Sequence, residues 1–252
     1  MNLSLIWIPL LLTFLAGICT VIGSFISLFL KKLNRSFLLL GLGFSAGVMI
    51  YISFAELLAS AVVDIGFIIA NIAFFSGMLV IMAIDFLVPH NYIAERVKVS
   101  KKNRRLMMAG VFTALGIAIH NFPEGIAVFF SSLTDISIGI PLALAIAIHN
   151  IPEGIAVSMP IYYATKSRKK AFWYSFFSGI AEPVGAVIGL LILMPFLSPS
   201  VLSFTLAFVG GIMVFISFDE LLPICYENGK AHIPIIGLII GMIIMALSLY
   251  LL

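Results

Sequence analysis

The sequence predicts an all-α protein, a polytopic membrane bundle of eight transmembrane helices, and three observations support this prediction. Of its 252 residues, 62% are hydrophobic and 10% are charged, with a mean hydropathy of +1.22; a soluble domain has about 45–50% apolar and about 25% charged residues. The apolar residues form eight runs of about 20, the length that crosses a bilayer as an α-helix. Two internal repeats predict that the helices form inverted halves.

The apolar runs predict a single transmembrane domain that covers residues 1–252. The first run has no basic segment before it and is too long for the core of a signal peptide, so we interpret it as a membrane helix. Cys19 and Cys225 lie far apart in apolar stretches and indicate neither a disulfide framework nor a cysteine metal site. The expected helices cover residues 4–30, 36–59, 66–88, 107–131, 137–163, 171–195, 201–224 and 233–251.

Basic residues predict the orientation in the membrane. All but one of the 14 Lys and Arg residues lie in the connections that follow the first, third and fifth helices, and Lys230 is expected on the opposite side. Basic residues concentrate in cytoplasmic connections. We therefore expect a multi-pass protein of the plasma membrane with both termini outside the cytoplasm.

The first internal repeat relates helices 1–3 to helices 6–8. Phe44–Leu58 (FSAGVMIYISFAELL) and Phe208–Leu222 (FVGGIMVFISFDELL) share nine of fifteen residues at an offset of 164, and Gly77 and Gly241 keep this offset. The first and sixth helices match weakly, at an offset of 162, in their glycines Gly17, Gly23, Gly179 and Gly185. Helices 2 and 7 are an odd number of crossings apart, so they run in opposite directions.

The second repeat relates helix 4 to helix 5. Ala118–Val128 (AIHNFPEGIAV) and Ala147–Val157 (AIHNIPEGIAV) agree at ten of eleven positions. Both copies lie about equally far into consecutive helices, so they meet head to tail near the bilayer centre. Inverted repeats with a site at the midplane are typical of secondary transporters.

The second repeat also carries side chains that bind metals. In each copy, His and Glu are four residues apart and project from one face of the helix, and the Asn after each His adds an amide oxygen. The proline in each copy removes a helix hydrogen bond, and the glycine after each Glu permits close backbone approach. With one further carboxylate before a proline in the sixth helix, the candidate ligands are His120, Asn121, Glu124, His149, Asn150, Glu153 and Glu182.

The free energy of burying these carboxylates indicates their role. An acidic residue at the centre of a membrane helix costs roughly 2.5–3.5 kcal/mol, so three cost about 8–10 kcal/mol, comparable to the net stability of a domain. None of the expected helices contains a Lys or Arg as a partner. The glutamates must therefore be protonated, face water or hold a cation. Imidazole, carboxylate and amide oxygen together suit zinc, iron(II), manganese or cobalt better than calcium or magnesium.

Other charged residues allow two interpretations. Glu56, Asp219 and Glu220 are expected toward the outer ends of the second and seventh helices, where they either attract cations or simply lie at the interface. Asp85 and His90 lie near the cytoplasmic end of the third helix, where a solvated role is favoured over a role in an exit path.

The motifs HNFPEG and HNIPEG on consecutive helices, with AEPVG in the sixth, resemble the ZIP (Zrt-, Irt-like) family of metal transporters, and most of all its bacterial ZupT-type members. The resemblance covers essentially the whole chain. It implies metal uptake into the cytoplasm by sliding of helices 1, 4, 5 and 6 against the rest. It also implies two adjacent metal sites bridged by Glu124 and Glu153, the first completed by the two histidines and the second by Asn121, Asn150 and Glu182.

The predicted function is therefore uptake of divalent transition metals, with metal ions and the lipid bilayer as partners. No resident cofactor and no nucleic acid are expected, because the metal at the site is the cargo; a homodimer is left open. A metal-gated cation channel is an alternative that the sequence separates poorly from a carrier. An intramembrane metalloenzyme is disfavoured, since the His-Glu-x-x-His spacing of metalloproteases is absent.

Overall fold

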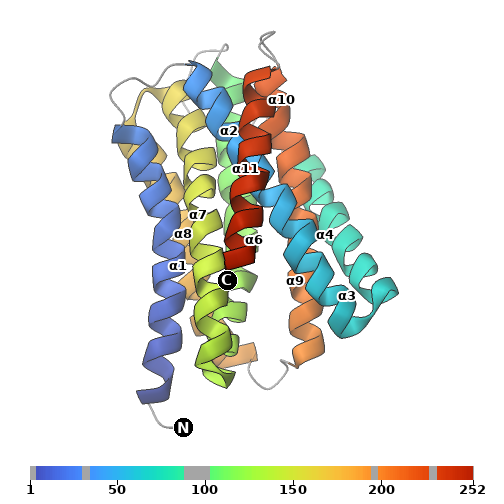
Figure 1. Ribbon diagram of the computed structural model, residues 1–252. Helices are drawn as coiled ribbons and strands as arrows, with labels where there is room; N and C mark the ends of the chain where they lie inside the picture. The colour runs from blue at the N-terminus through green and yellow to red at the C-terminus, as the bar shows by residue number, and fades with distance from the viewer. Residues whose placement is uncertain (1–3, 30–34, 88–102, 194–197, 227–231, 252) are drawn as a thin grey trace.

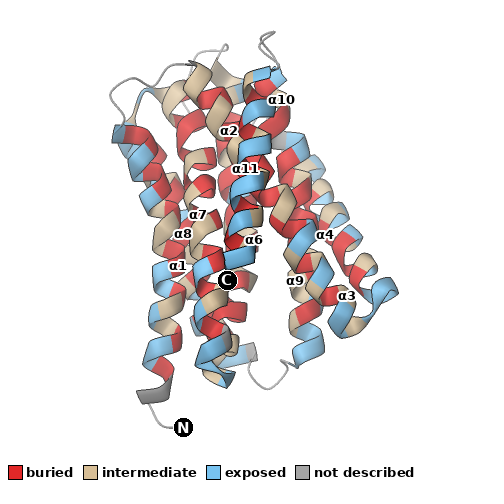
Figure 2. Cartoon of the chain, in the orientation of Figure 1, coloured by how far each residue is buried: buried red, intermediate tan, exposed pale blue. Residues whose placement is uncertain are grey.

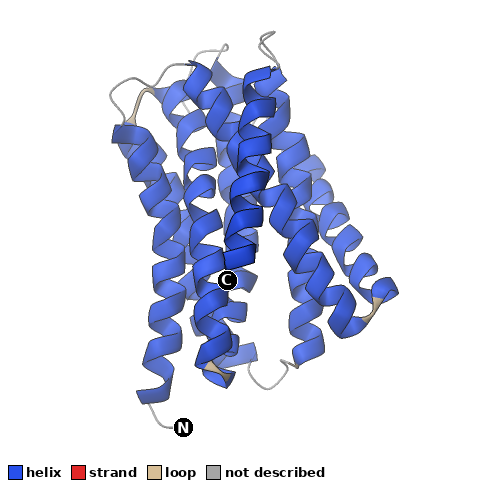
Figure 3. Ribbon diagram, in the orientation of Figure 1, coloured by secondary structure: helices blue, strands red, loops and turns tan. Residues whose placement is uncertain are grey.

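The computed structural model describes residues 4–29, 35–87, 103–193, 198–226 and 232–251, and all regular structure in these residues is helical (Figure 3). Eight helices among them are long and apolar enough to cross a membrane. The predicted all-α polytopic bundle is therefore confirmed.

Five of the eight spans are single helices: α1 (Ser4–Phe29), α4 (Phe67–Leu87), α6 (Arg104–Thr134), α7 (Ile136–Thr165) and α11 (His232–Leu251). The other three contain π-helical segments. They are α2 (Arg35–Ile52) with η1 (Ser53–Leu58) and α3 (Ala59–Ile65), α8 (Arg168–Ile188) with η3 (Gly189–Leu193), and α9 (Pro199–Ile216) with η5 (Ser217–Leu221) and α10 (Leu222–Tyr226). These bounds agree with the expected ranges to within a few residues, except that the second span continues to Ile65.

The helices pack as two blocks (Figure 1). In the first, the site block, α1 packs along α7 and α8 packs along α6. In the second, the frame block, α2 packs along α11 and α9 packs along α4, with the short α3 and α10 continuing α2 and α9. The blocks meet mainly where α2 contacts α7 and where α9 contacts α6. Buried residues concentrate in the interior helices, whereas α4 and α11 expose most of their apolar surface (Figure 2).

Glycine contacts in the frame block reproduce the first sequence repeat. A Cβ atom at Gly47 of α2 would meet the carbonyl oxygen of Leu238 in α11, and one at Gly211 of α9 would meet the carbonyl oxygen of Phe74 in α4. The offset of 164 converts one contact into the other. The same offset relates the two π-helical segments, since Ser53 begins η1 and Ser217 begins η5. The two helix pairs of the frame block are therefore built alike.

One end of the bundle carries the basic residues. The described Lys and Arg lie within the first three residues of α2, α6 and α8 or directly after α7, and these helix ends lie together (Figure 1). The end of α10 and the start of α11 lie at this end too. Lys230, which is expected on the opposite side, lies outside the described residues.

The acidic residues of the two π-helical segments lie toward opposite ends of the bundle. The span that starts at the basic end with α2 contains η1, with Glu56, in its second half. The span that starts with α9 runs toward the basic end and contains η5, with Asp219 and Glu220, in its second half. The expectation that all three lie toward the outer ends of their helices is therefore wrong. The reason is the inverted repeat itself, because corresponding positions on helices that run in opposite directions approach opposite faces of the membrane.

Replacing Gly211 by Ala should lower the free energy of unfolding. The added Cβ would meet the carbonyl oxygen of Phe74, which is backbone and cannot rotate away, and overpacking of this kind costs about 1–3 kcal/mol. Gly47→Ala should cost a similar amount. Thermal unfolding in detergent measures both, with Gly41→Ala as control, because a Cβ there meets only the Ile155 side chain at 3.2 Å. Equal unfolding temperatures for Gly211→Ala and Gly41→Ala would contradict the close contact.

Candidate metal site

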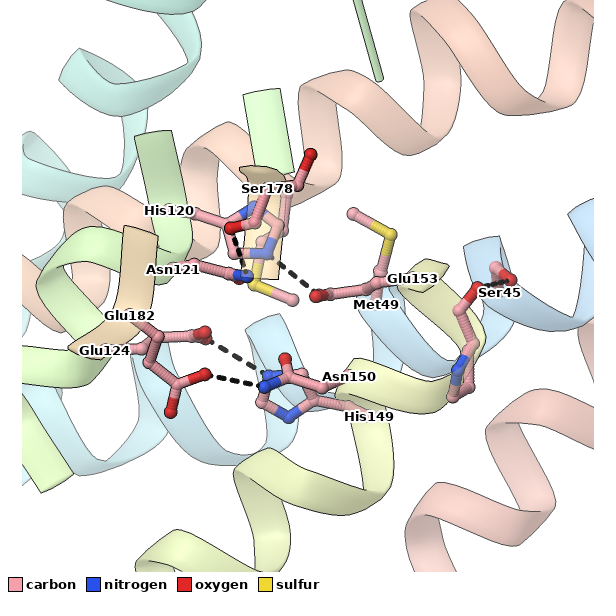
Figure 4. Close-up of polar contacts among 12 residues, drawn as sticks. Ser45, Met49, His120, Asn121, Glu124, His149, Asn150, Glu153, Ser178 and Glu182 are labelled. Atoms are coloured by element: carbon pink, nitrogen blue, oxygen red, sulfur yellow. Dashed lines mark hydrogen bonds and ion pairs between the residues drawn. The ribbon is translucent and has the colours of Figure 1, made fainter. Parts of the chain in front are cut away.

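The two copies of the repeated motif meet inside the site block, near the middle of α6 and α7 (Figure 4). Both helices continue without a break through Pro123 and Pro152. Every predicted ligand side chain is fully buried, at 0% exposure. Three helices contribute them: α6 carries His120, Asn121 and Glu124, α7 carries His149, Asn150 and Glu153, and α8 carries Glu182.

The histidines and glutamates pair between the two helices. Nε2 of His120 lies 2.8 Å from Oε1 of Glu153, and Nε2 of His149 lies 3.2 Å from Oε1 of Glu124. Each His therefore contacts the Glu of the other copy and not the Glu one turn along its own helix. The crossed pairs join α6 to α7 at the centre of the block.

The two asparagines connect the motif helices to α8 and α1. Asn121 donates from Nδ2 to the carbonyl oxygen of Ser178 at 3.1 Å. Asn150 donates from Nδ2 to the carbonyl oxygen of Ala16 at 2.9 Å and to Oε2 of Glu182 at 2.7 Å. The second of these contacts brings Glu182 into the site. Both Oδ1 atoms keep their lone pairs without a hydrogen-bond partner.

The glycine after each Glu permits the close packing that the sequence predicts. A Cβ atom at Gly125 would meet the carbonyl oxygen of Glu182 in α8, and one at Gly154 would meet the carbonyl oxygen of Thr20 in α1. Only a residue without a Cβ allows the backbones to approach this closely. The same residues that end the two motifs therefore hold α8 and α1 against the site.

The site contains many polar atoms without hydrogen-bond partners, although buried polar atoms normally have one. They include both carboxylate oxygens of Glu124, Oε2 of Glu153, Oε1 of Glu182 and Nδ1 of both histidines. Such oxygen and nitrogen lone pairs are the donors that a divalent transition metal uses. The donors stand as pairs, however: in the part of the chain that the structure describes, no three His, Cys, Asp or Glu side chains are arranged to hold one ion together.

The remaining acidic residues lie on other elements. Glu56 of η1 is half-buried and accepts a hydrogen bond from Oγ of Ser60 at 3.2 Å, and Asp219 of η5 is exposed. Asp85 is half-buried near the end of α4. His90 lies outside the described residues.

Sequence reasoning missed a contact between the two blocks. Ser45 of α2 is fully buried and donates from Oγ to the carbonyl oxygen of Pro152 in α7 at 2.6 Å. The first repeat contained a signal for it, since Val209 occupies the corresponding position in the other copy. A serine in only one of two otherwise similar apolar helices indicates a partner that the other helix lacks.

The fold and the buried cluster define the class of protein as a polytopic membrane transporter. A scan against known protein families matches residues 89–249 to the family described as ZIP zinc transporter. The chain is 55% identical to the zinc transporter ZupT of Chlorobium phaeovibrioides, covering 96% of this chain and 97% of that protein. It is 52% identical to the zinc transporter ZupT of Streptococcus mutans, covering 96% of each, and 47% identical to that of Clostridium perfringens, covering 99% and 98%. The chain therefore belongs to the ZIP family, whose members are transporters and not enzymes.

The crossed pairs predict which residues depend on each other for stability. In a double-mutant cycle on metal-free protein, His120→Ala and Glu153→Ala should show a coupling energy of about 0.6–1.7 kcal/mol, the range for polar contacts between membrane helices. His120→Ala and Glu124→Ala, which lie on one helix and form no hydrogen bond or ion pair with each other among the described contacts, should show a smaller coupling energy. Unfolding in detergent measures both cycles. A larger coupling within α6 than between α6 and α7 would contradict the crossed arrangement.

Proposed function

We propose that this protein carries divalent transition-metal ions, zinc and also iron(II), manganese and cobalt, into the cytoplasm through the buried site of α6, α7 and α8. The observation that supports this most strongly is the complete burial of three Glu, two His and two Asn side chains, with at least one oxygen of each Glu and of each Asn lacking a hydrogen-bond partner. The described Lys and Arg lie at one end of the bundle, so none of them neutralises this cluster. Relatives that are named zinc transporters support zinc as a substrate.

The site is proposed to hold two adjacent ions. Glu124 and Glu153 would bridge them, with the two histidines completing the first position and Glu182 with the two asparagines completing the second. The short distances between the motif helices support shared carboxylates, since each Glu already contacts the opposite helix. Binding of metal would replace the two His–Glu contacts, because the ring nitrogens and carboxylate oxygens that now contact each other are the atoms that would bind the metal once each nitrogen has lost its proton.

Metal binding would also reduce the free energy of the buried site. Three carboxylates in a membrane helix bundle cost several kcal/mol if charged, and a divalent ion supplies the opposite charge that the described side chains do not. We propose that this neutralisation lets the loaded site cross the hydrocarbon layer.

Movement is proposed to occur as sliding of the site block against the frame block. Close glycine contacts onto backbone occur inside each block, as at Gly154 and Gly211. Between the blocks, a Cβ at Gly41 or at Gly116 would meet only side chains, those of Ile155 and Ile216. Side chains can change rotamer during a movement, whereas a backbone contact cannot. The interface between the two blocks therefore opposes sliding less than the contacts inside each block do. The hydrogen bond from Ser45 to Pro152 would break on the way.

Metal uptake by protein in liposomes tests the function. Zinc uptake should saturate with concentration and should be lost in Glu153→Gln, which keeps the shape of the side chain and removes its charge. Asp135→Asn makes the same chemical change at the exposed N-cap of α7, where Asn caps as well as Asp, and should leave uptake unchanged. Uptake of iron(II), manganese and cobalt in parallel gives the selectivity. Full uptake by folded Glu153→Gln would refute the site, and ionic currents in place of saturation would favour the metal-gated channel.

The orientation is proposed from the basic end of the bundle, which should face the cytoplasm. In a variant without Cys19 and Cys225, a cysteine replacing the exposed Thr134 should react with a membrane-impermeant maleimide in intact cells. A cysteine replacing Lys169, which is exposed at the basic end, should react only after the cells are disrupted. The reverse pattern would show the opposite orientation.

A further inference from the structure

The site block has an internal two-fold pseudo-symmetry that exchanges α1 with α8 and α6 with α7. A Cβ at Gly17 would lie 2.7 Å from the carbonyl oxygen of Gly179, and a Cβ at Gly179 would lie 2.6 Å from that of Gly17. These residues are related by the weak offset of 162 between the first and sixth helices. Two glycines that contact each other reciprocally lie next to the symmetry axis.

Three further pairs of contacts follow the same exchange. Gly23 approaches the carbonyl oxygen of Ile151 as Gly185 approaches that of Phe122. Asn150 donates to the carbonyl oxygen of Ala16 as Asn121 donates to that of Ser178.

The third pair identifies a counterpart of Glu182. Gly125 approaches the carbonyl oxygen of Glu182, and Gly154 approaches the carbonyl oxygen of Thr20. The side chains begin at matching places as well: a Cβ at Gly17 would lie 3.3 Å from Cβ of Glu182, and one at Gly179 would lie 3.0 Å from Cβ of Thr20. Thr20 therefore stands on α1 where Glu182 stands on α8, and the same exchange relates Asn121 to Asn150, the partner of Glu182.

The hydroxyl of Thr20 also differs from those of most other threonines in the described helices. A Thr in a membrane helix commonly donates its hydroxyl to the carbonyl four residues earlier, and four threonines here do so: Thr13, Thr134, Thr165 and Thr205. The hydroxyl of Thr20 is fully buried and has no partner, a property that it shares with Thr113 of α6. The carbonyl oxygen of Ala16, which it would normally use, accepts from Asn150. Asn121 Oδ1 in the same half of the site is likewise buried without a partner.

We propose that Thr20 and Asn121 form a neutral oxygen subsite, the counterpart of the charged subsite of Glu182 and Asn150, and that position 20 determines how the metal charge is distributed in the site. The inference rests on the proposed function. A hydroxyl and an amide oxygen attract a divalent ion less than a carboxylate does, so this subsite binds a water molecule held by the ion. Buried waters of this kind use two to four polar partners, which Thr20, Asn121 and the ion supply. The second ion therefore lies on the α8 side.

Moving the carboxylate across the pseudo-symmetry axis tests this inference. Zinc binding to purified full-length protein is measured by equilibrium dialysis for the unmodified chain, for Glu182→Thr and for the exchanged double variant Thr20→Glu with Glu182→Thr. Glu182→Thr should weaken binding of the second ion by about tenfold or more, and the exchanged variant should restore it. Thr20→Gln with Glu182→Thr is the matched control, since it has the same size without the charge and should stay weak.

The outcomes separate this inference from the proposed function. If Glu182→Thr binds zinc as the unmodified chain does, the ligand role of Glu182 is wrong, and the inference falls with it. If Glu182→Thr loses binding and the exchanged variant stays as weak as its Gln control, with equal unfolding temperatures, Glu182 is a ligand but Thr20 is not its counterpart. Thr20→Val in the unmodified chain gives an independent result, should the exchanged variant fail to fold. It should weaken zinc binding by about tenfold, and unchanged binding would overturn the subsite.

Discussion

Three glutamate side chains are fully buried inside a bundle whose outer surface is largely apolar. Most of the packing around them depends on this burial. Carboxylates at this depth are costly, so four helices enclose them and other polar groups approach them closely. Gly125 and Gly154 let α8 and α1 come near the motif backbones, and the amides of Asn121 and Asn150 bind the carbonyl oxygens of those two helices. The two histidines contact the carboxylates of Glu124 and Glu153 between α6 and α7.

The helices around the buried glutamates are related by inverted repeats, so a few types of contact are each used twice. In the frame block, one type of glycine contact is used twice, at Gly47 and at Gly211. In the site block, four types of contact recur on exchange of α1 with α8 and α6 with α7. The copies differ at two buried polar positions. Ser45 faces Pro152 where the other copy has Val209, and Thr20 stands where the other copy has Glu182.

The sequence predicts most of the fold because lipid imposes simple rules. Span length follows from bilayer thickness, and all eight spans are found close to their expected ranges. Six of the seven candidate ligands follow from two nearly identical motifs, and all seven are fully buried. The crossed pairing of His120 with Glu153 did not follow, because spacing along one helix shows which side chains share a face but not which residue lies opposite.

Other misses have separate physical causes. The predicted position of Asp219 was wrong because its helix runs opposite to the helix that contains Glu56. Residues late in these two helices therefore lie toward opposite ends of the bundle, as the inverted repeat implies. The π-helical segments could not be predicted, since an extra residue per turn leaves no clear mark in the apolar pattern. Thr20 was missed because the offset of 162 is supported by few identities and a buried Thr in a membrane helix usually has a local role.

Anomalous diffraction at the zinc absorption edge, from crystals of the zinc-loaded protein, tests the central claim most directly. The account predicts anomalous density between α6 and α7, in contact with Glu124 and Glu153, and a second peak beside Glu182. Density for zinc elsewhere in the bundle, with these three glutamates uninvolved, would contradict it.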